Sequence, residues 1–126
     1  MSLSADVELR LPAESAYVAV LRMTTAGLAA RLDFTLDDIE DLRMAVGEAC
    51  ALVLEHADPG GDLHAAFDLT DGSIRVSVSA DSSSDSDPDE HSFGWQVLTA
   101  LTSDVLTSRE GRLHWVSFTV RSSIAV

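Results

Sequence analysis

The chain contains no lysine and no asparagine, and these two absences exclude specific chemistry before any motif is considered. Without lysine there is no P-loop phosphate ligand, no Schiff-base nucleophile and no ammonium general base. Without asparagine, no amide of that residue can ligate a metal or stabilise an oxyanion. The single cysteine, Cys50, excludes a disulfide within the chain and gives no indication of an oxidising compartment.

Basic residues are also scarce, because eight arginines stand against 21 acidic residues and give a formal charge of −13 over 126 residues. This balance argues against direct binding to nucleic acid or to an anionic membrane surface, where cationic side chains supply the attraction. It favours an acidic protein that docks a basic partner. Residues 1–10 contain no signal-peptide pattern and no apolar run approaches the ~20 residues of a membrane span, so we expect a cytoplasmic protein.

Hydrophobic residues make up 46% of the chain, and their spacing predicts a single α+β domain over residues 1–126. Strands and helices occur in separate runs, which predicts a two-layer sandwich with helices on one face of a mostly antiparallel sheet. The expected elements are a strand over 7–12, helices over 13–32 and 36–57, a hairpin over 62–79 that turns at Asp71-Gly72, a helix over 93–101, and two strands between 105 and 120. The apolar spacing predicts that Phe93 and Leu98 are buried in the helix over 93–101, and it places Tyr17 and Val20 on the apolar stripe of the helix over 13–32.

The helix expected over 36–57 places Glu48 on a flank that is otherwise apolar, beside Met44, Ala45 and Leu52. A carboxylate in that setting can act as a general base with a raised pKa. It can equally reach solvent at the edge of the helix layer, and the residues alone leave both readings open. Cys50 falls on the opposite apolar stripe, so we expect a buried, unreactive thiol.

The remaining candidate ligands do not predict a metal site. The four histidines show no metal-ligand spacing with one another or with Cys50, so we expect scattered surface or half-buried side chains. They are His56, His64, His91 and His114. The acidic, serine-rich segment at about 81–91 lacks the glycine turn of a calcium loop, and its composition predicts a flexible, solvated loop.

Three separated segments, in the right order, resemble RsbW-type anti-sigma factors, which are serine-kinase relatives of the histidine-kinase ATPase superfamily. Residues 42–57 resemble the family's central helix, 92–105 resemble its second glycine box, especially in mycobacterial anti-sigma-F members, and 111–120 resemble its closing strand pair. The resemblance implies the Bergerat ATP-binding fold and a homodimer. It also implies two partners: an alternative sigma factor, and an anti-anti-sigma protein of the STAS type that the kinase phosphorylates on serine.

Four residues of this chain match functional positions of the family. The resemblance implies that Glu48 is the general base, that Asp81 reads adenine, and that Gly94 belongs to the phosphate-binding G-x-G box. Arg22, on the first helix, matches an arginine that family members use against their sigma factor.

Several other positions depart from the family pattern. Leu52 stands four residues after Glu48, where the family has an asparagine that ligates magnesium. The first glycine box, D-x-G-x-G, would fall at 81–85, where Ser83 and Asp85 replace its glycines, and Ser92 replaces the first glycine of the second box. Because those glycines allow backbone N–H groups to approach phosphates closely, their loss weakens a triphosphate site.

We therefore expect an anti-sigma factor with a degenerate ATP site, no resident cofactor and no metal. One alternative is an active RsbW-type kinase that uses Mg-ATP, in which Glu48 is the base, Asp81 contacts adenine, and Asp85 or water replaces the magnesium ligand. A second alternative is a small-ligand sensor that uses the vestigial pocket between Glu48, Leu52 and Gly94.

Overall fold

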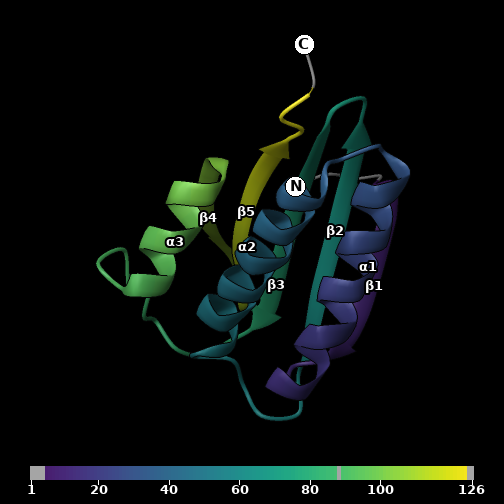
Figure 1. Cartoon of the computed structure of the whole chain (residues 1–126). Helices are drawn as coiled ribbons and strands as arrows, with labels where there is room; N and C mark the ends of the chain where they lie inside the picture. The colour runs from purple at the N-terminus through teal and green to yellow at the C-terminus, as the bar shows by residue number, and fades with distance from the viewer. Residues whose placement is uncertain (1–4, 88, 125–126) are drawn as a thin grey trace.

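Five strands form one sheet in the order β1-β2-β3-β5-β4 (Figure 1). The computed structural model describes residues 5–87 and 89–124. The strands are β1 (Val7–Pro12), β2 (Asp62–Thr70), β3 (Ser73–Asp81), β4 (Ser103–Glu110) and β5 (Leu113–Arg121). All four neighbouring pairs are antiparallel, which confirms the expected fold class.

The helices cover one face of this sheet, as Figure 1 shows. They are α1 (Val18–Arg31), which a short 3-10 turn at Ser15–Tyr17 precedes, α2 (Leu36–Leu54) and α3 (Phe93–Leu101). The central helix, α2, contacts α1 on one side, α3 on the other, and β3 and β5 beneath it. The core lies between α2 and the inward side chains of the central strands.

Local sequence signals account for the boundaries that hold this arrangement. Thr35 caps α2, because its hydroxyl accepts a hydrogen bond from the Asp38 backbone N–H at 3.1 Å. Gly72 adopts a φ of 79° in the tight turn between β2 and β3, which an L side chain rarely tolerates. Both features follow directly from the sequence.

The burial of the outer helices differs from the expectation. Phe93, expected to be buried, is 79% exposed, and Leu98 is the buried residue of α3. The reason is that α3 packs mainly on α2 and not on the sheet, so only a narrow apolar stripe of α3 is covered. Tyr17, at the end of the 3-10 turn, and Val20, on α1, are exposed as well. Among the residues that the structure describes, no helix is long and apolar enough to cross a membrane.

Candidate functional site

Glu48 and Gly94 meet where the start of α3 approaches the middle of α2. Glu48 is half-buried, and a Cβ added to Gly94 would lie 2.6 Å from Glu48 Oε2. A side chain at position 94 would therefore displace the carboxylate. The structure thus brings together two of the residues that the family resemblance singled out.

Leu52 follows Glu48 by one helical turn on the same face of α2. It is 7% exposed and belongs to the hydrophobic core cluster. An aliphatic side chain offers no lone pair to a metal ion. In the described part of the chain, no group of three or more His, Cys, Asp or Glu side chains is arranged to hold a metal.

A cavity of about 280 Å³ lies beside Leu52, and we call it the α2–β5 cavity. Val53 comes from the end of α2, His56 from the turn that follows it, and His114 and Val116 from β5. Residues of β4 and of the acidic loop complete its wall: Thr107, Ser108, Arg109, Ser86, Asp87 and Glu90. The cavity is therefore apolar toward the core and polar toward the loop.

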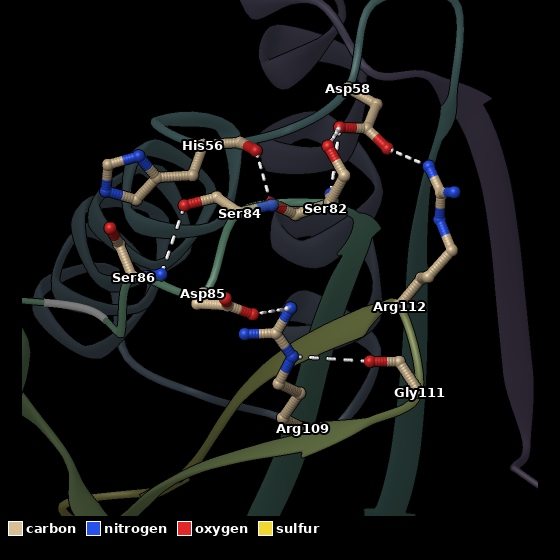
Figure 2. Close-up of polar contacts among 10 residues, drawn as sticks. His56, Asp58, Ser82, Ser84, Asp85, Ser86, Arg109, Gly111 and Arg112 are labelled. Atoms are coloured by element: carbon tan, nitrogen blue, oxygen red, sulfur yellow. Dashed lines mark hydrogen bonds and ion pairs between the residues drawn. The ribbon is translucent and has the colours of Figure 1, made fainter.

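The first half of the acidic loop is attached to the end of α2, as Figure 2 shows. Ser82 Oγ donates a hydrogen bond to the His56 carbonyl, and Ser84 N–H donates to Ser82 Oγ at 3.1 Å. Asp58 accepts hydrogen bonds from the backbone N–H and the hydroxyl of Ser83, both at 2.9 Å. The flexibility expected of the segment 81–91 stays a prediction, but these contacts hold its beginning in place.

Two arginines of the β4–β5 hairpin form ion pairs with the neighbouring segments, one with the acidic loop and one with the segment between α2 and β2 (Figure 2). Arg112 pairs with Asp58, and Arg109 pairs with Asp85 at 3.6 Å while its Nε donates to the Gly111 carbonyl at 3.3 Å. The hydrogen bonds from Ser83, followed by the contact with Arg112, lower the pKa of the Asp58 carboxyl. Asp85 is therefore paired with an arginine at the exposed surface of the loop.

Asp81 ends β3 on the opposite phase of the strand from the core residues. Val76, Val78 and Ala80 face the helices, so the alternation turns the Asp81 side chain to the other face. Its Cβ lies 3.6 Å from the position of a Cβ added to Gly61. The structure thus places Asp81 beside Gly61, whereas Glu48 and Gly94 lie in the helix layer.

Arg22 lies on the exposed side of α1 and extends over α2. A Cβ added to Gly47 would lie 2.4 Å from Arg22 Nη2, so the guanidinium rests directly on the glycine backbone. It forms no ion pair with any carboxylate of residues 5–87 or 89–124. Val18, Ala19, Ala51 and Leu54 line the shallow groove between the two helices beside it.

Cys50 lies beneath this surface and is fully buried, as the sequence predicts. Burial raises the pKa of its thiol to about 12, although the charge of Arg22 acts in the opposite direction. The thiol is therefore protonated at neutral pH and is a poor nucleophile.

The sequence analysis missed His114 as a site residue. It is 8% exposed, and its Nε2 is buried with no hydrogen-bond partner among the described residues. The signal was present, because His114 occupies the same strand phase as Val116, Phe118 and Val120. No sequence pattern identifies the ion pairs of Arg109 and Arg112, since their partners, Asp85 and Asp58, lie 24 and 54 residues away along the chain.

Comparisons with known proteins agree with this geometry. Residues 11–120 match the family model described as histidine kinase-like ATPase domain. Over 73 residues, 57% of this chain, it is 44% identical to the serine-protein kinase RsbW of Halalkalibacterium halodurans. Over 74 residues it is 38% identical to the serine-protein kinase RsbW of Bacillus thuringiensis. These matches span 45% and 46% of the two relatives, so the chain matches less than half of their length.

A solved structure shows the same fold. A crystal structure of the RsbU and RsbW domains of Rv1364c from Mycobacterium tuberculosis superposes with a TM-score of 0.68 at 20% identity. The match covers 92% of this chain and 31% of that one. The family model, which covers most of the chain, and the RsbW relatives lead to one conclusion: the chain belongs to the histidine kinase-like ATPase domain family and is of the RsbW type.

Proposed function

We infer that this protein is an anti-sigma factor that sequesters an alternative sigma factor in the cytoplasm and releases it when an anti-anti-sigma protein of the STAS type binds. In this proposal, sequestration uses protein–protein contact and does not require Mg-ATP. The observation that carries the proposal is Leu52, a buried aliphatic side chain at the position where the family resemblance implies a magnesium ligand.

The residues at the site do not fit Mg-ATP. Ser83 and Asp85 stand where the family's first glycine box has glycines, and Ser84 N–H donates a hydrogen bond to Ser82 Oγ beside them. The loop adds Asp85, Asp87 and Glu90, whose negative charges oppose a triphosphate. This misfit supports the proposal that the site no longer binds Mg-ATP.

The charge of the chain supports the choice of partner. Sigma factors bind DNA and therefore carry basic surfaces. An acidic protein with a net charge of −13 attracts such a surface over long range and competes with DNA for it. A homodimer, as the resemblance implies, is part of the proposal.

Arg22 supports the position of the docking surface. It is a fixed cation without a carboxylate partner in the described part of the chain, although the chain has many more acids than bases. The apolar groove beside it extends the surface toward Ala51 and Leu54 of α2. An acidic residue of the sigma factor, flanked by apolar side chains, would complement this arrangement.

The test is a titration of each purified sigma factor of the source organism with the wild-type chain and two variants. Arg22→Ala should weaken binding of the cognate sigma factor by about tenfold or more, because a charged contact at an interface is removed. Arg31→Ala on the same helix is the matched control and should leave binding unchanged. If no sigma factor binds at low salt, or if both variants bind like the wild type, the proposal fails.

The kinase alternative rests on Glu48, which lies against Gly94 and is half-buried. It requires a replacement for the magnesium ligand, and Asp85, the candidate from the sequence, is paired with Arg109. Transfer of phosphate to a STAS-domain serine by the purified chain, lost in Glu48→Gln, would establish this alternative over the first.

A further inference from the structure

One face of the sheet carries no helix in the described part of the chain, because α1, α2 and α3 all lie on the other face (Figure 1). Strand alternation places Ala66 of β2, Ser77 of β3 and Trp115 of β5 on the uncovered face, since the residues beside them in each strand belong to the core. The strand registers add Glu8 of β1 and Leu106 of β4. We call the surface that these five side chains mark the open sheet face.

The centre of the open sheet face has both a large aromatic ring and hollows beside it. Two cavities, of about 520 and 170 Å³, lie over it and share Ala66, Ser77 and Trp115 in their walls. Trp115 is half-buried, and Leu106 at the margin is 58% exposed. Tryptophan is enriched in protein interfaces, where its ring fills a pocket of the partner. A surface that has both a ring and a hollow can complement a second copy of itself.

The charges of the open sheet face are of both signs. The Arg75 guanidinium donates hydrogen bonds to Ser117 Oγ at 3.0 Å and to Thr119 Oγ1 at 2.9 Å, which fix it across β3 and β5. Within residues 5–87 and 89–124, Arg75 forms no ion pair with a carboxylate. Asp68 and Glu8 line the same cavity and form no ion pair with an arginine of those ranges. A facing copy would bring a charge of opposite sign within reach of each.

The net charge of the chain limits where a second copy can lie. Two chains of −13 repel each other, and this repulsion is strongest where the contact surface carries only carboxylates. Three of the eight arginines, Arg10, Arg75 and Arg121, have the outward strand phase of the open sheet face. Self-association is therefore less unfavourable here than on a surface of carboxylates alone.

The open sheet face is also large enough for a stable interface. Its three central strands, β2, β3 and β5, have nine residues each, and five strands lie side by side. At about 3.3 Å per residue and about 4.8 Å between strands, the face measures roughly 700 Å². Each partner in a protein–protein complex of standard size buries about 800 Å². A second copy that covers the whole face falls close to this size.

From these observations we propose that the open sheet face is the surface through which two copies of this chain associate, packed face to face about a two-fold axis. Trp115 of each copy lies on the small side chains Ala66 and Ser77 of the other, and Arg75 faces a carboxylate of the other copy. This inference rests on the homodimer of the proposed function and assigns its interface. The sigma-docking surface on α1 belongs to the helix layer, so the two surfaces can be tested separately.

Sedimentation velocity of the full chain over a wide range of concentrations tests the interface. The wild type should change from monomer to dimer as the concentration rises. Ala66→Arg places a long cation in the centre of the face and should raise the dimer Kd by about a hundredfold or more. Ala100→Arg, the same substitution at an exposed position of α3, is the matched control and should leave the Kd unchanged.

A charge reversal gives a second, independent variant. Arg75→Glu should also raise the dimer Kd by about tenfold or more, because the face then carries carboxylates without their cation. Arg22→Glu makes the same charge change on α1; it should lose sigma binding and keep the wild-type dimer Kd. Circular dichroism and thermal melting establish that each variant is folded, and Arg75→Glu decides the question if Ala66→Arg is not.

Tryptophan fluorescence reports on the face directly. Trp95→Phe leaves Trp115 as the only tryptophan of the chain. Its emission should shift to longer wavelength on dilution, as dissociation exposes the ring to water, and in Ala66→Arg the shifted emission should be present at every concentration.

Two results would overturn the proposal. If the wild type is monomeric at every concentration, the homodimer and its interface are both removed, while the sigma titration still decides sequestration. If Ala66→Arg and Arg75→Glu form dimers like the wild type, the homodimer stands but its interface lies elsewhere. If instead no sigma factor binds and the two variants still lose the dimer, the proposed function fails and the interface is established.

Discussion

Replacement of Leu52 tests whether the nucleotide site has been converted into part of the core. Leu52 is 7% exposed, so Leu52→Asn removes nearly all of the burial energy of a leucine, about 2 kcal/mol. It also places an amide in the wall of the α2–β5 cavity, where incomplete hydrogen bonding costs about 1 kcal/mol more. We therefore expect a loss of about 3 kcal/mol in the free energy of unfolding. At about 4 °C per kcal/mol, the melting temperature falls by about 12 °C.

Urea denaturation and thermal melting, each with and without Mg-ATP, measure this effect. Leu52→Ala should cost about 2–5 kcal/mol and Leu52→Met less than about 1.5 kcal/mol, because the methionine keeps the volume. Introducing the family's asparagine at position 52 should not restore nucleotide binding, since the glycines of the loop remain absent. The reasoning is refuted if Leu52→Asn is as stable as the wild type. It is also refuted if Mg-ATP raises the free energy of unfolding of this variant by ~2.7 kcal/mol, the amount that a ligand at ~100 times its Kd contributes.

Three further substitutions test other parts of the account. Because the pKa of Asp58 is lowered in the folded chain, its carboxylate stabilises the fold fully above about pH 4, and this contribution is lost as the pH falls through the folded pKa. The stability difference between the wild type and Asp58→Asn should therefore be constant near neutral pH and shrink in acid; a constant difference at every pH would contradict it. Gly94→Ala should cost about 1 kcal/mol in urea denaturation because it displaces the Glu48 carboxylate. Its control, Gly27→Ala, faces open space and should stabilise α1 by about 0.5–1 kcal/mol; equal effects of the two would refute the contact. Gly47→Ala should displace the Arg22 guanidinium and weaken sigma binding while leaving the melting temperature nearly unchanged, and unaltered affinity would show that the position of Arg22 is unimportant.

The order of the elements could be predicted from the sequence because local signals specify it. Asp71-Gly72 marks a tight turn between alternating strands, and Thr35 with Asp38 marks a helix start, and neither depends on distant residues. The exposure of Phe93 could not be predicted in this way. Helical spacing identifies an apolar stripe, but it does not reveal whether a helix packs on a sheet or only on the edge of another helix.

The candidate site shows the same division. Glu48 and Gly94 could be paired from family positions, and the structure places them in contact range. The contacts of Asp58 with the acidic loop and with the β4–β5 turn could not be predicted, because Ser83 and Arg112 reach it across 25 and 54 residues. For Asp81, the structure adds a position that the motif does not specify: the strand phase turns its side chain away from the helices, beside Gly61, and its role toward adenine stays a prediction.

The most direct test of sigma sequestration without nucleotide is calorimetric titration of the cognate sigma factor with the full chain, once in EDTA and once in Mg-ATP. The account predicts one Kd under both conditions, because no step of binding passes through a nucleotide. A complex that forms only with Mg-ATP, or that tightens by about tenfold when Mg-ATP is added, would contradict the account and show that sigma binding depends on nucleotide.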